Sequence, residues 1–354
     1  MNNLYIKICN ILIYIMLSVG IPKEIKVCEN RVSMIPDDIK KIVDSGILVY
    51  FQKGAGINSG YNDYEYIEVG AIMVDTIEEL YKQSKLIVKV KEPQEGEYRL
   101  INNTHTIFTF FHFASNKTLV DNMKSSGASC YPYEIIKNKK DNGEIYYPIL
   151  SNMSVIAGEQ AFNVADLFIK SNNSNHSYDI HITIIGTGNV GLSAMKIAIK
   201  LGYKNINLID NNYQKILNIK HEYDNLANIS IYSMNNDNLN FLMRKSIIII
   251  GSIYNTGMKA DRLLTNDILD SMTKGAIIMD VAIDQGGITE QSKITSIDEP
   301  IIEYNGVNIY CVPNIPSTAP RKASILLSNS IVDYVKALST NNLHLYPELL
   351  KDNL

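Results

Sequence analysis

Hydrophobic and polar positions alternate along the chain in blocks that predict strands and helices in turn. Short apolar runs are typical of buried strands, whereas apolar residues spaced three and four apart indicate helices. The apolar runs predict strands at 17–21, 47–51, 86–90, 107–111, 180–185, 207–209, 246–250, 276–280 and 307–312. The spaced patterns predict helices at 36–43, 76–83, 154–168, 190–201 and 325–337. This alternation predicts an α/β protein with parallel sheets.

A glycine-rich turn follows the apolar run at 180–185. It reads Gly186-Thr187-Gly188-Asn189-Val190-Gly191, and Asp210 comes 19 residues later, at the end of the next apolar run. In this layout the glycines allow a sharp turn, a close approach of the backbone to a pyrophosphate, and tight packing of the following helix. The helix N-terminus offers N–H groups to phosphates, and an aspartate so placed accepts a ribose 2′-hydroxyl and repels a 2′-phosphate. The pattern predicts a dinucleotide site for NAD rather than NADP.

The length of 354 residues is enough for two domains with separate cores. We expect two Rossmann-like, doubly wound domains with a cleft between them, one for the dinucleotide and one for the substrate. In open parallel sheets, ligands bind beyond the carboxyl ends of the strands. Polar residues directly after apolar strands are therefore the first candidates for the site.

Composition and charge exclude several classes of protein. A net charge of −4, without a basic run that contains aromatic residues, argues against a nucleic-acid partner. The four cysteines lie far apart and form no CxxC pair, so we predict buried thiols in a reducing cytosol and no metal site. The apolar run at 8–20 is too short for a membrane span. We expect residues 1–15 to be an N-terminal extension, with Met16 as an alternative start, on a cytoplasmic protein without a membrane partner.

Four polar residues that follow apolar strands are candidates for chemistry: Arg31, Lys91, His112 and Asp284. Taken singly, each has a structural explanation, such as a solvated charge, a lysine that reaches water, or a turn residue. Together they suit a small oxo acid. Arg31 would pair with its carboxylate, and Lys91 would lie beside its carbonyl or carboxylate. His112 would transfer protons near neutral pH, and Asp284 would orient water or ammonia. Strand alternation also predicts that Lys89 and Lys91 share one face.

Six segments of the chain resemble the alanine dehydrogenase family, which includes the NAD-binding subunit of transhydrogenase. They are Gly20-Ile21-Pro22-Lys23-Glu24, Glu29-Asn30-Arg31-Val32, Lys91-Glu92-Pro93, Phe108-Thr109-Phe110-Phe111-His112, Ala282-Ile283-Asp284-Gln285-Gly286-Gly287 and Asn314-Ile315-Pro316. The resemblance runs in order from about Val19 to Tyr334. It implies NAD-dependent interconversion of L-alanine with pyruvate and ammonium.

The resemblance also implies a domain layout and a set of site residues. The cofactor domain of the family interrupts the substrate domain, which gives 16–150 plus 320–354 for the substrate and 151–319 for NAD. His112 and Asp284 would be the acid–base groups, and Arg31, Lys91 and Asn314 would bind the substrate. The cofactor residues would be Ser154, Gly186, Gly188, Asn189, Val190, Gly191, Asp210, Ser233, Gly251 and Ser252.

Three departures from the family pattern bear on assembly and substrate. An acidic residue is lost in Ser154-Val155-Ile156-Ala157-Gly158, and the usual Pro-Arg-Thr-Ser is Pro320-Arg321-Lys322-Ala323-Ser324. An Asn/Ser loop replaces most of a glycine-rich hairpin that lies at subunit contacts in the family, so a homo-oligomer is expected as a hexamer or a dimer. Two other functions stay open. One is the opine- or saccharopine-type reductive condensation of a 2-oxo acid with an amino acid, and the other is a non-catalytic, transhydrogenase-like NAD-binding subunit.

Overall fold

The chain folds into two compact α/β units in the computed structural model, which describes residues 18–113, 116–141, 143, 145–172, 177–253, 260–340, 342–346 and 349. Unit 1 comprises Met1–Met153 and Ala319–Leu354, and unit 2 comprises Ser154–Thr318. Unit 2 is therefore inserted in the sequence of unit 1. The predicted extension 1–15 and the centre of the polar loop at 171–177 lie outside the described residues.

Unit 1 is built on a parallel sheet of six strands. These are β1 (Val19–Ile21), β2 (Val49–Gln52), β3 (Ile72–Val74), β4 (Leu86–Lys91), β5 (Thr106–Phe110) and β6 (Ser129–Pro132). Their order in the sheet is β3-β2-β1-β4-β5-β6, which is the doubly wound order with its switch point between β1 and β4. Ligands of such sheets bind at the carboxyl ends of the strands beside that switch point.

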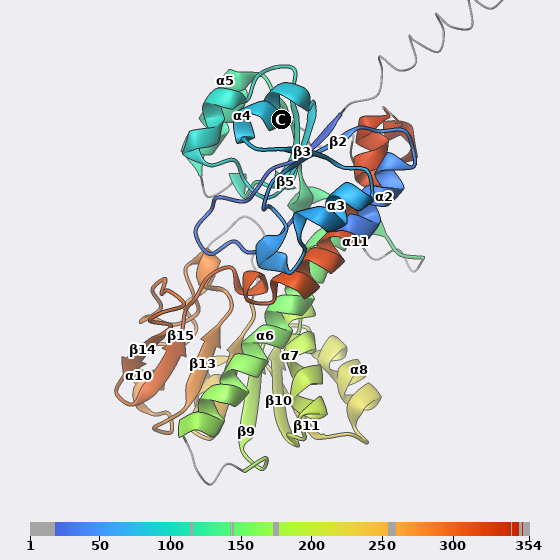
Figure 1. Ribbon diagram of the computed structural model, residues 1–354. Helices are drawn as coiled ribbons and strands as arrows, with labels where there is room; N and C mark the ends of the chain where they lie inside the picture. Colours follow the sequence, from blue (N-terminus) through green and yellow to red (C-terminus); the bar gives the residue numbers. More distant parts are fainter. Residues whose placement is uncertain are drawn as a thin grey trace, which may run out of the picture. The chain divides into compact units, whose positions relative to one another are not determined.

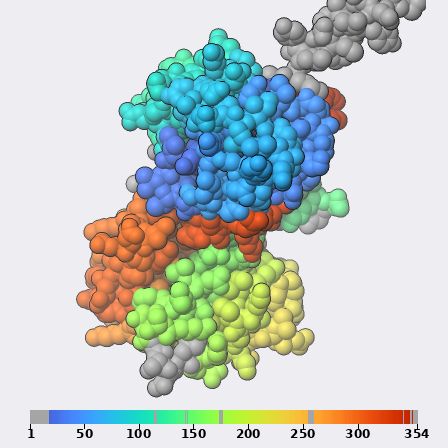
Figure 2. Space-filling model, in the orientation of Figure 1, coloured from blue at the N-terminus to red at the C-terminus, as the bar shows by residue number. Residues whose placement is uncertain are grey.

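Helices cover this sheet and return the end of the chain to it. They are α2 (Pro36–Val43), α3 (Asp63–Glu68), α4 (Ile77–Gln83), α5 (Lys117–Ser126) and α11 (Pro320–Ser339). Short 3-10 turns include η1 (Ile57–Ser59), η2 (Glu95–Leu100), η4 (Tyr133–Ile135) and η7 (Leu343–Leu345), and β7 (Asn138–Lys139) pairs with β8 (Ile145–Tyr146). Helix α11 packs on α2, and α2 contacts α3 (Figure 1). In the space-filling view, the red atoms of α11 lie against the blue N-terminal part of the chain (Figure 2).

Unit 2 is built on a sheet of seven strands. These are β9 (His181–Ile185), β10 (Asn205–Asp210), β11 (Asn228–Ser233), β12 (Ser246–Gly251), β13 (Ile277–Asp280), β14 (Ile301–Tyr304) and β15 (Val307–Tyr310). The order is β11-β10-β9-β12-β13-β15-β14, and among the described strands of this sheet only β14 runs antiparallel. The switch point lies between β9 and β12. The expectation of an α/β protein with two Rossmann-like folds is confirmed.

The helices of unit 2 cover both faces of its sheet. They are α6 (Pro148–Asn172), which begins in unit 1, α7 (Asn189–Lys200), α8 (Tyr213–Tyr223), α9 (Asn236–Met243) and α10 (Asn266–Asp270), with 3-10 turns η5 (Ile283–Gln285) and η6 (Ile315–Thr318). Strand alternation divides the core in two. Ile182 and Ile184 pack under α6 and α7 with Phe162, whereas Ile185 and Ile249 belong to a second core on the other face (Figure 1).

The structure also bears on the cysteine thiols and on possible membrane-spanning helices. Cys130 and Cys311 are buried, and burial raises the pKa of each thiol to about 12. The prediction of buried thiols is wrong for Cys28, which is exposed because it lies on the loop after β1. Among the helices that the structure describes, none combines the length and apolarity needed to cross a bilayer.

Candidate functional site

Three of the predicted site residues converge at the switch point of unit 1. Arg31 follows β1, Lys91 ends β4 and His112 follows β5, and these three strands are neighbours in the parallel sheet. The positive charges of Lys91, Lys26 and Arg31 all act on the imidazole of His112. Three segments of the chain, which follow β1, β4 and β5, thus contribute to one cationic cluster at the edge where ligands of this fold bind.

The Arg31 guanidinium is held in place by a buried carboxylate. Glu29 accepts hydrogen bonds from Nε of Arg31 at 2.7 Å and from Nη2 at 2.5 Å, and both side chains are almost completely buried. Nη1 lies 3.3 Å from Sδ of Met153. Such a bidentate pair fixes the plane of the guanidinium. Sequence reasoning missed Glu29, although its position two residues before Arg31 was a usable signal.

Helix α11 fixes the loop that carries Arg31. Oγ of Ser324 accepts a hydrogen bond from the backbone N–H of Val32 at 2.9 Å, and Oγ of Ser328 accepts one from Ile35 at 3.1 Å. Ser328 in turn donates to the buried Asp38 at 2.5 Å. The C-terminal helix α11 therefore stabilises the segment after Arg31.

The two lysines of β4 have different surroundings. Lys89 is fully buried, with Nζ 2.9 Å from Oε1 of Glu97 and 3.5 Å from Oε2 of Glu24. Burial raises the pKa of Glu24 to about 7 despite the opposing charge of Lys89. The β4–β5 pairing shifts register between Val88 and Lys91. This shift interrupts the alternation of side chains between the two faces of the sheet, from which Lys89 and Lys91 were predicted to share one face. Lys89 belongs to this buried cluster, while Lys91 acts on His112.

His112 has an unusual backbone and a shifted pKa. Its φ is +52°, in the left-handed region that L-residues other than glycine seldom adopt. Desolvation, followed by the charges of Lys91, Lys26 and Arg31, lowers the pKa of the imidazole to about 3. Nδ1 lies 3.9 Å from Oε2 of Glu92, which is too long for a hydrogen bond. At neutral pH the ring is uncharged and can accept a proton, although its side chain is still 46% exposed.

The glycine turn of unit 2 has the geometry that a pyrophosphate site requires. Gly186 has φ +85°, and a Cβ on Gly191 would overlap the carbonyl oxygen of Gly186. Gly188 is the N-cap of α7, and no described side chain caps that helix end. A Cβ on Gly188 would meet no described atom within 4 Å, so space remains beside the turn. Asn189 and Val190 begin α7, whose first N–H groups suit an anion.

Asp210, at the end of β10, stabilises this turn by hydrogen bonds. Its Oδ2 accepts hydrogen bonds from N–H and Oγ1 of Thr187, both at 2.7 Å, and Oδ1 accepts one from Asn212 at 2.9 Å. Burial alone would raise the pKa of this carboxyl, but the hydrogen bonds outweigh it and hold the pKa below its ordinary value. Ser233 pairs with Asp210 across β10 and β11, so both lie at the same sheet edge.

The remaining predicted cofactor residues have contacts within the protein. Ser252 donates through Oγ to the carbonyl oxygen of Gly186 at 2.7 Å, which ties β12 to the glycine turn across the switch point. Gly251 packs so closely on Ile288 that a Cβ would overlap it. Ser154 lies within α6. A role of these three in cofactor binding stays a prediction.

Asp284 and Asn314 lie on loops of unit 2 that follow strands of its sheet. Asp284 is an exposed residue of the turn η5, and Asn314 has φ +57°. The loop after η5 is anchored by Asp280, a buried carboxylate that accepts hydrogen bonds from N–H of Ile288 at 2.8 Å and from Oγ of Ser292 at 2.5 Å. Sequence reasoning missed this function of Asp280, although an acidic residue at the end of an apolar strand was a signal for it.

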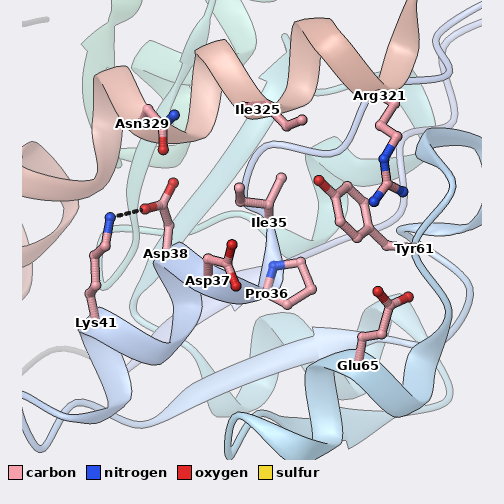
Figure 3. A pocket seen from close by; sticks show the side chains of 10 residues that line it. All are labelled: Ile35, Pro36, Asp37, Asp38, Lys41, Tyr61, Glu65, Arg321, Ile325 and Asn329. Carbon is pink, nitrogen blue, oxygen red and sulfur yellow. Dashed lines mark hydrogen bonds and ion pairs between the residues drawn. The ribbon is translucent and has the colours of Figure 1, made fainter.

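A separate pocket lies in unit 1 along α2 and α11 (Figure 3). Two of its cations have partners within the lining: Nζ of Lys41 is 2.6 Å from Oδ1 of Asp38, and the Arg321 guanidinium stacks 4.2 Å from the centroid of the Tyr61 ring. Arg321 also donates to the carbonyl oxygen of Gly60 at 2.5 Å. None of the predicted site residues lines this pocket, so these contacts serve the packing of α11.

Comparison with known proteins agrees with this arrangement. Residues 20–157 match the family "Alanine dehydrogenase/PNT, N-terminal domain", and residues 175–352 match "Alanine dehydrogenase/PNT, C-terminal domain". An alanine dehydrogenase of Staphylococcus epidermidis is 32% identical over 95% of this chain and 91% of its own length. One from Mycolicibacterium smegmatis is 31% identical over 91% of this chain and 87% of its own length.

The similarity extends to solved structures. An L-alanine dehydrogenase superposes with a TM-score of 0.86 at 29% identity, covering 94% of each chain. Both halves of the sequence and the overall fold thus agree with those of this family. The chain belongs to the alanine dehydrogenase/PNT family.

Proposed function

We propose that the protein catalyses the NAD-dependent, reversible oxidative deamination of L-alanine to pyruvate and ammonium. The observation that carries this proposal is the convergence of Arg31, Lys91 and His112 at adjacent strand ends, in a chain that aligns with alanine dehydrogenases over nearly its whole length. In this proposal unit 1 binds the amino or oxo acid and unit 2 binds NAD.

The cationic cluster supplies the groups that an oxo acid needs. Arg31 would bind the substrate carboxylate through charge-assisted hydrogen bonds, and its pair with Glu29 sets the guanidinium plane beforehand. Lys91 would lie at the carbonyl and polarise it. Asn314 would contact the substrate as well, from the loop after β15. Fixed donors of this kind cost little reorganisation when the substrate arrives.

His112 would move the proton. Its imidazole is neutral at physiological pH, so in alanine oxidation it accepts a proton from the water that attacks the imine carbon. A bound substrate carboxylate adds negative charge beside Arg31 and Lys91, which raises the pKa of the imidazole. In the direction of amination the ring can then carry the proton it must donate. Asp284 would be the second acid–base group.

The residues of the glycine turn fit NAD. Gly188 leaves space for the pyrophosphate at the start of α7, where Asn189, Val190 and Gly191 follow. Asp210 would accept the ribose hydroxyl and disfavour a 2′-phosphate. A bound NAD would supply the acceptor for the hydride that leaves Cα of alanine. Ser154, Ser233, Gly251 and Ser252 complete the set of cofactor residues.

A direct assay of NADH absorbance tests the proposal. The purified protein should oxidise NADH when given pyruvate and ammonium, and His112→Ala should slow this by about 10²–10⁴-fold. Lysine or ornithine in place of ammonium should give no comparable rate. A higher rate with those amines would establish condensation instead, and no pyruvate-dependent rate with any amine would contradict the enzymatic function. Light scattering in the same buffer would determine the subunit number of the proposed cytoplasmic homo-oligomer.

A further inference from the structure

The backbone at His112 needs an external restraint. Strand β5 pairs with β6 only over Thr106–Thr109, so the N–H groups of Phe111 and His112 lie beyond the last ladder partner on that side. His112 also has φ +52°, and conformations of this kind persist only where the surrounding structure holds them. The direction of the imidazole depends on what holds these two residues.

The carboxylate of Glu134 provides that restraint. Its Oε1 accepts a hydrogen bond from N–H of His112 at 2.6 Å, and its Oε2 accepts one from N–H of Phe111 at 3.2 Å. The Glu134 side chain thus accepts the hydrogen bonds of two residues that lie beyond the last pairing of β5 with β6. Both N–H groups point to one carboxylate, which restricts the peptide plane between them.

Glu134 is itself firmly placed. It lies in η4, directly after Tyr133, whose fully buried ring packs edge-on against Phe108 at 4.4 Å and Phe110 at 5.0 Å between centroids. Burial raises the pKa of Glu134, while the hydrogen bonds and the charge of Lys91 oppose the shift. Glu134 therefore contacts the backbone of His112 directly, within reach of the charge of Lys91.

We propose that Glu134 is a positioning residue, which holds the His112 backbone in its left-handed conformation and so aims the imidazole beside Lys91. The inference rests on the proposed dehydrogenase function and adds a residue to it. The Glu92 carboxylate lies 3.9 Å from Nδ1, which is beyond hydrogen-bond distance, whereas Glu134 bonds directly to the backbone of His112.

Glu134→Gln and Glu134→Ala test this in the full-length protein. Glutamine keeps the size but has one acceptor oxygen, and its NH₂ group faces an N–H donor. We expect kcat for pyruvate amination to fall about 10- to 100-fold, because misplacement of a reacting group by about 1 Å costs that much. KM for pyruvate should change less than about 3-fold, and Glu134→Asp should recover part of the rate. Glu65→Gln is the matched control, since Oε2 of Glu65 also accepts a backbone N–H, from Asn62 at 2.7 Å.

A double-mutant cycle separates positioning from general damage. In the His112→Ala background, Glu134→Gln should slow the enzyme by less than about 2-fold, because the group that it positions is absent. An equal loss in both backgrounds, or normal kcat in Glu134→Gln, would overturn the inference. A wild-type protein inactive on pyruvate would instead overturn the proposed function, and with it this catalytic role. A crystal structure of Glu134→Ala would then still show whether residue 112 leaves its left-handed conformation.

Discussion

Thr187 donates both its backbone N–H and its hydroxyl to one oxygen of Asp210, each at 2.7 Å. The residue at the centre of the glycine turn is therefore tied to the carboxylate that the sequence assigns to a ribose. One aspartate at the end of β10 thus fixes the shape of the turn.

Asp210→Ala should weaken NADH binding and reduce the preference over NADPH. Hydrogen bonds to a charged carboxylate are worth about 1.5–3 kcal/mol, which corresponds to roughly 10- to 150-fold in Kd. Fluorescence titration with both nucleotides measures this. Thr187→Val is the control, because it keeps the N–H donor and should change the Kd of NADH less than about 3-fold. An unchanged Kd in Asp210→Ala would contradict the NAD assignment of this residue.

Glu29→Ala should strongly destabilise the protein. It would leave the Arg31 guanidinium buried without its bidentate partner, and breaking a buried pair in this way costs about 3–5 kcal/mol. Urea unfolding measures the free energy. Asp44→Ala removes the partner of Lys40 in an exposed pair and should cost less than about 1 kcal/mol. Equal losses in the two variants would show that Arg31 is solvated in solution.

Ser324→Ala should affect both stability and substrate binding. The N–H of Val32 would lose its acceptor, at a cost of about 1–3 kcal/mol, and the neighbouring Arg31 would be held less firmly. We expect a higher KM for pyruvate with an unchanged Kd for NADH. Ser339→Ala is the control on the same helix, since that hydroxyl bonds only to the helix's own carbonyl of Val335 among the contacts described. A pyruvate KM equal to that of the control would disprove the link through α11.

The titration of His112 should respond to Lys91. Desolvation and neighbouring cations lower the pKa of the imidazole, so the folded protein binds this proton less tightly than the unfolded chain. The stability that the neutral ring preserves is therefore present above about pH 6.5 and declines as the pH falls further. NMR titration of the ring should give a pKa below 6.5 that rises in Lys91→Met. A normal pKa in the wild-type protein would remove the electrostatic argument for the cluster.

Features that depend on local sequence patterns, such as helix α2 and the glycine turn, were predicted correctly. Helix α2 begins and ends at the predicted residues because Pro36 starts it and Ile39 and Ile42 define its buried face. The glycine turn was visible because its geometry admits few residues other than glycine. Strands β3, β6, β11 and β14 were not predicted, since all four lie at sheet edges, where patterning is weak.

The role of Glu134 could not be predicted, because this side chain acts across the sheet. Glu134 follows β6 yet holds the end of β5. Nothing local in the sequence pairs Glu134 with His112. Likewise, the register shift in β4 that separates Lys89 from Lys91 depends on pairing with β5, and a period of two cannot reveal it.

In the proposed reaction, a hydride moves between the nicotinamide and Cα of a three-carbon acid, and the amino group comes from ammonium. Incubation of the protein with pyruvate, ammonium and NADH deuterated at the transferred C4 position tests this directly, with NMR and chiral chromatography of the product. We expect L-alanine carrying deuterium at Cα, formed in proportion to the NADH consumed. Deuterated lactate, an N-substituted amino acid, or NADH left unconsumed would contradict it.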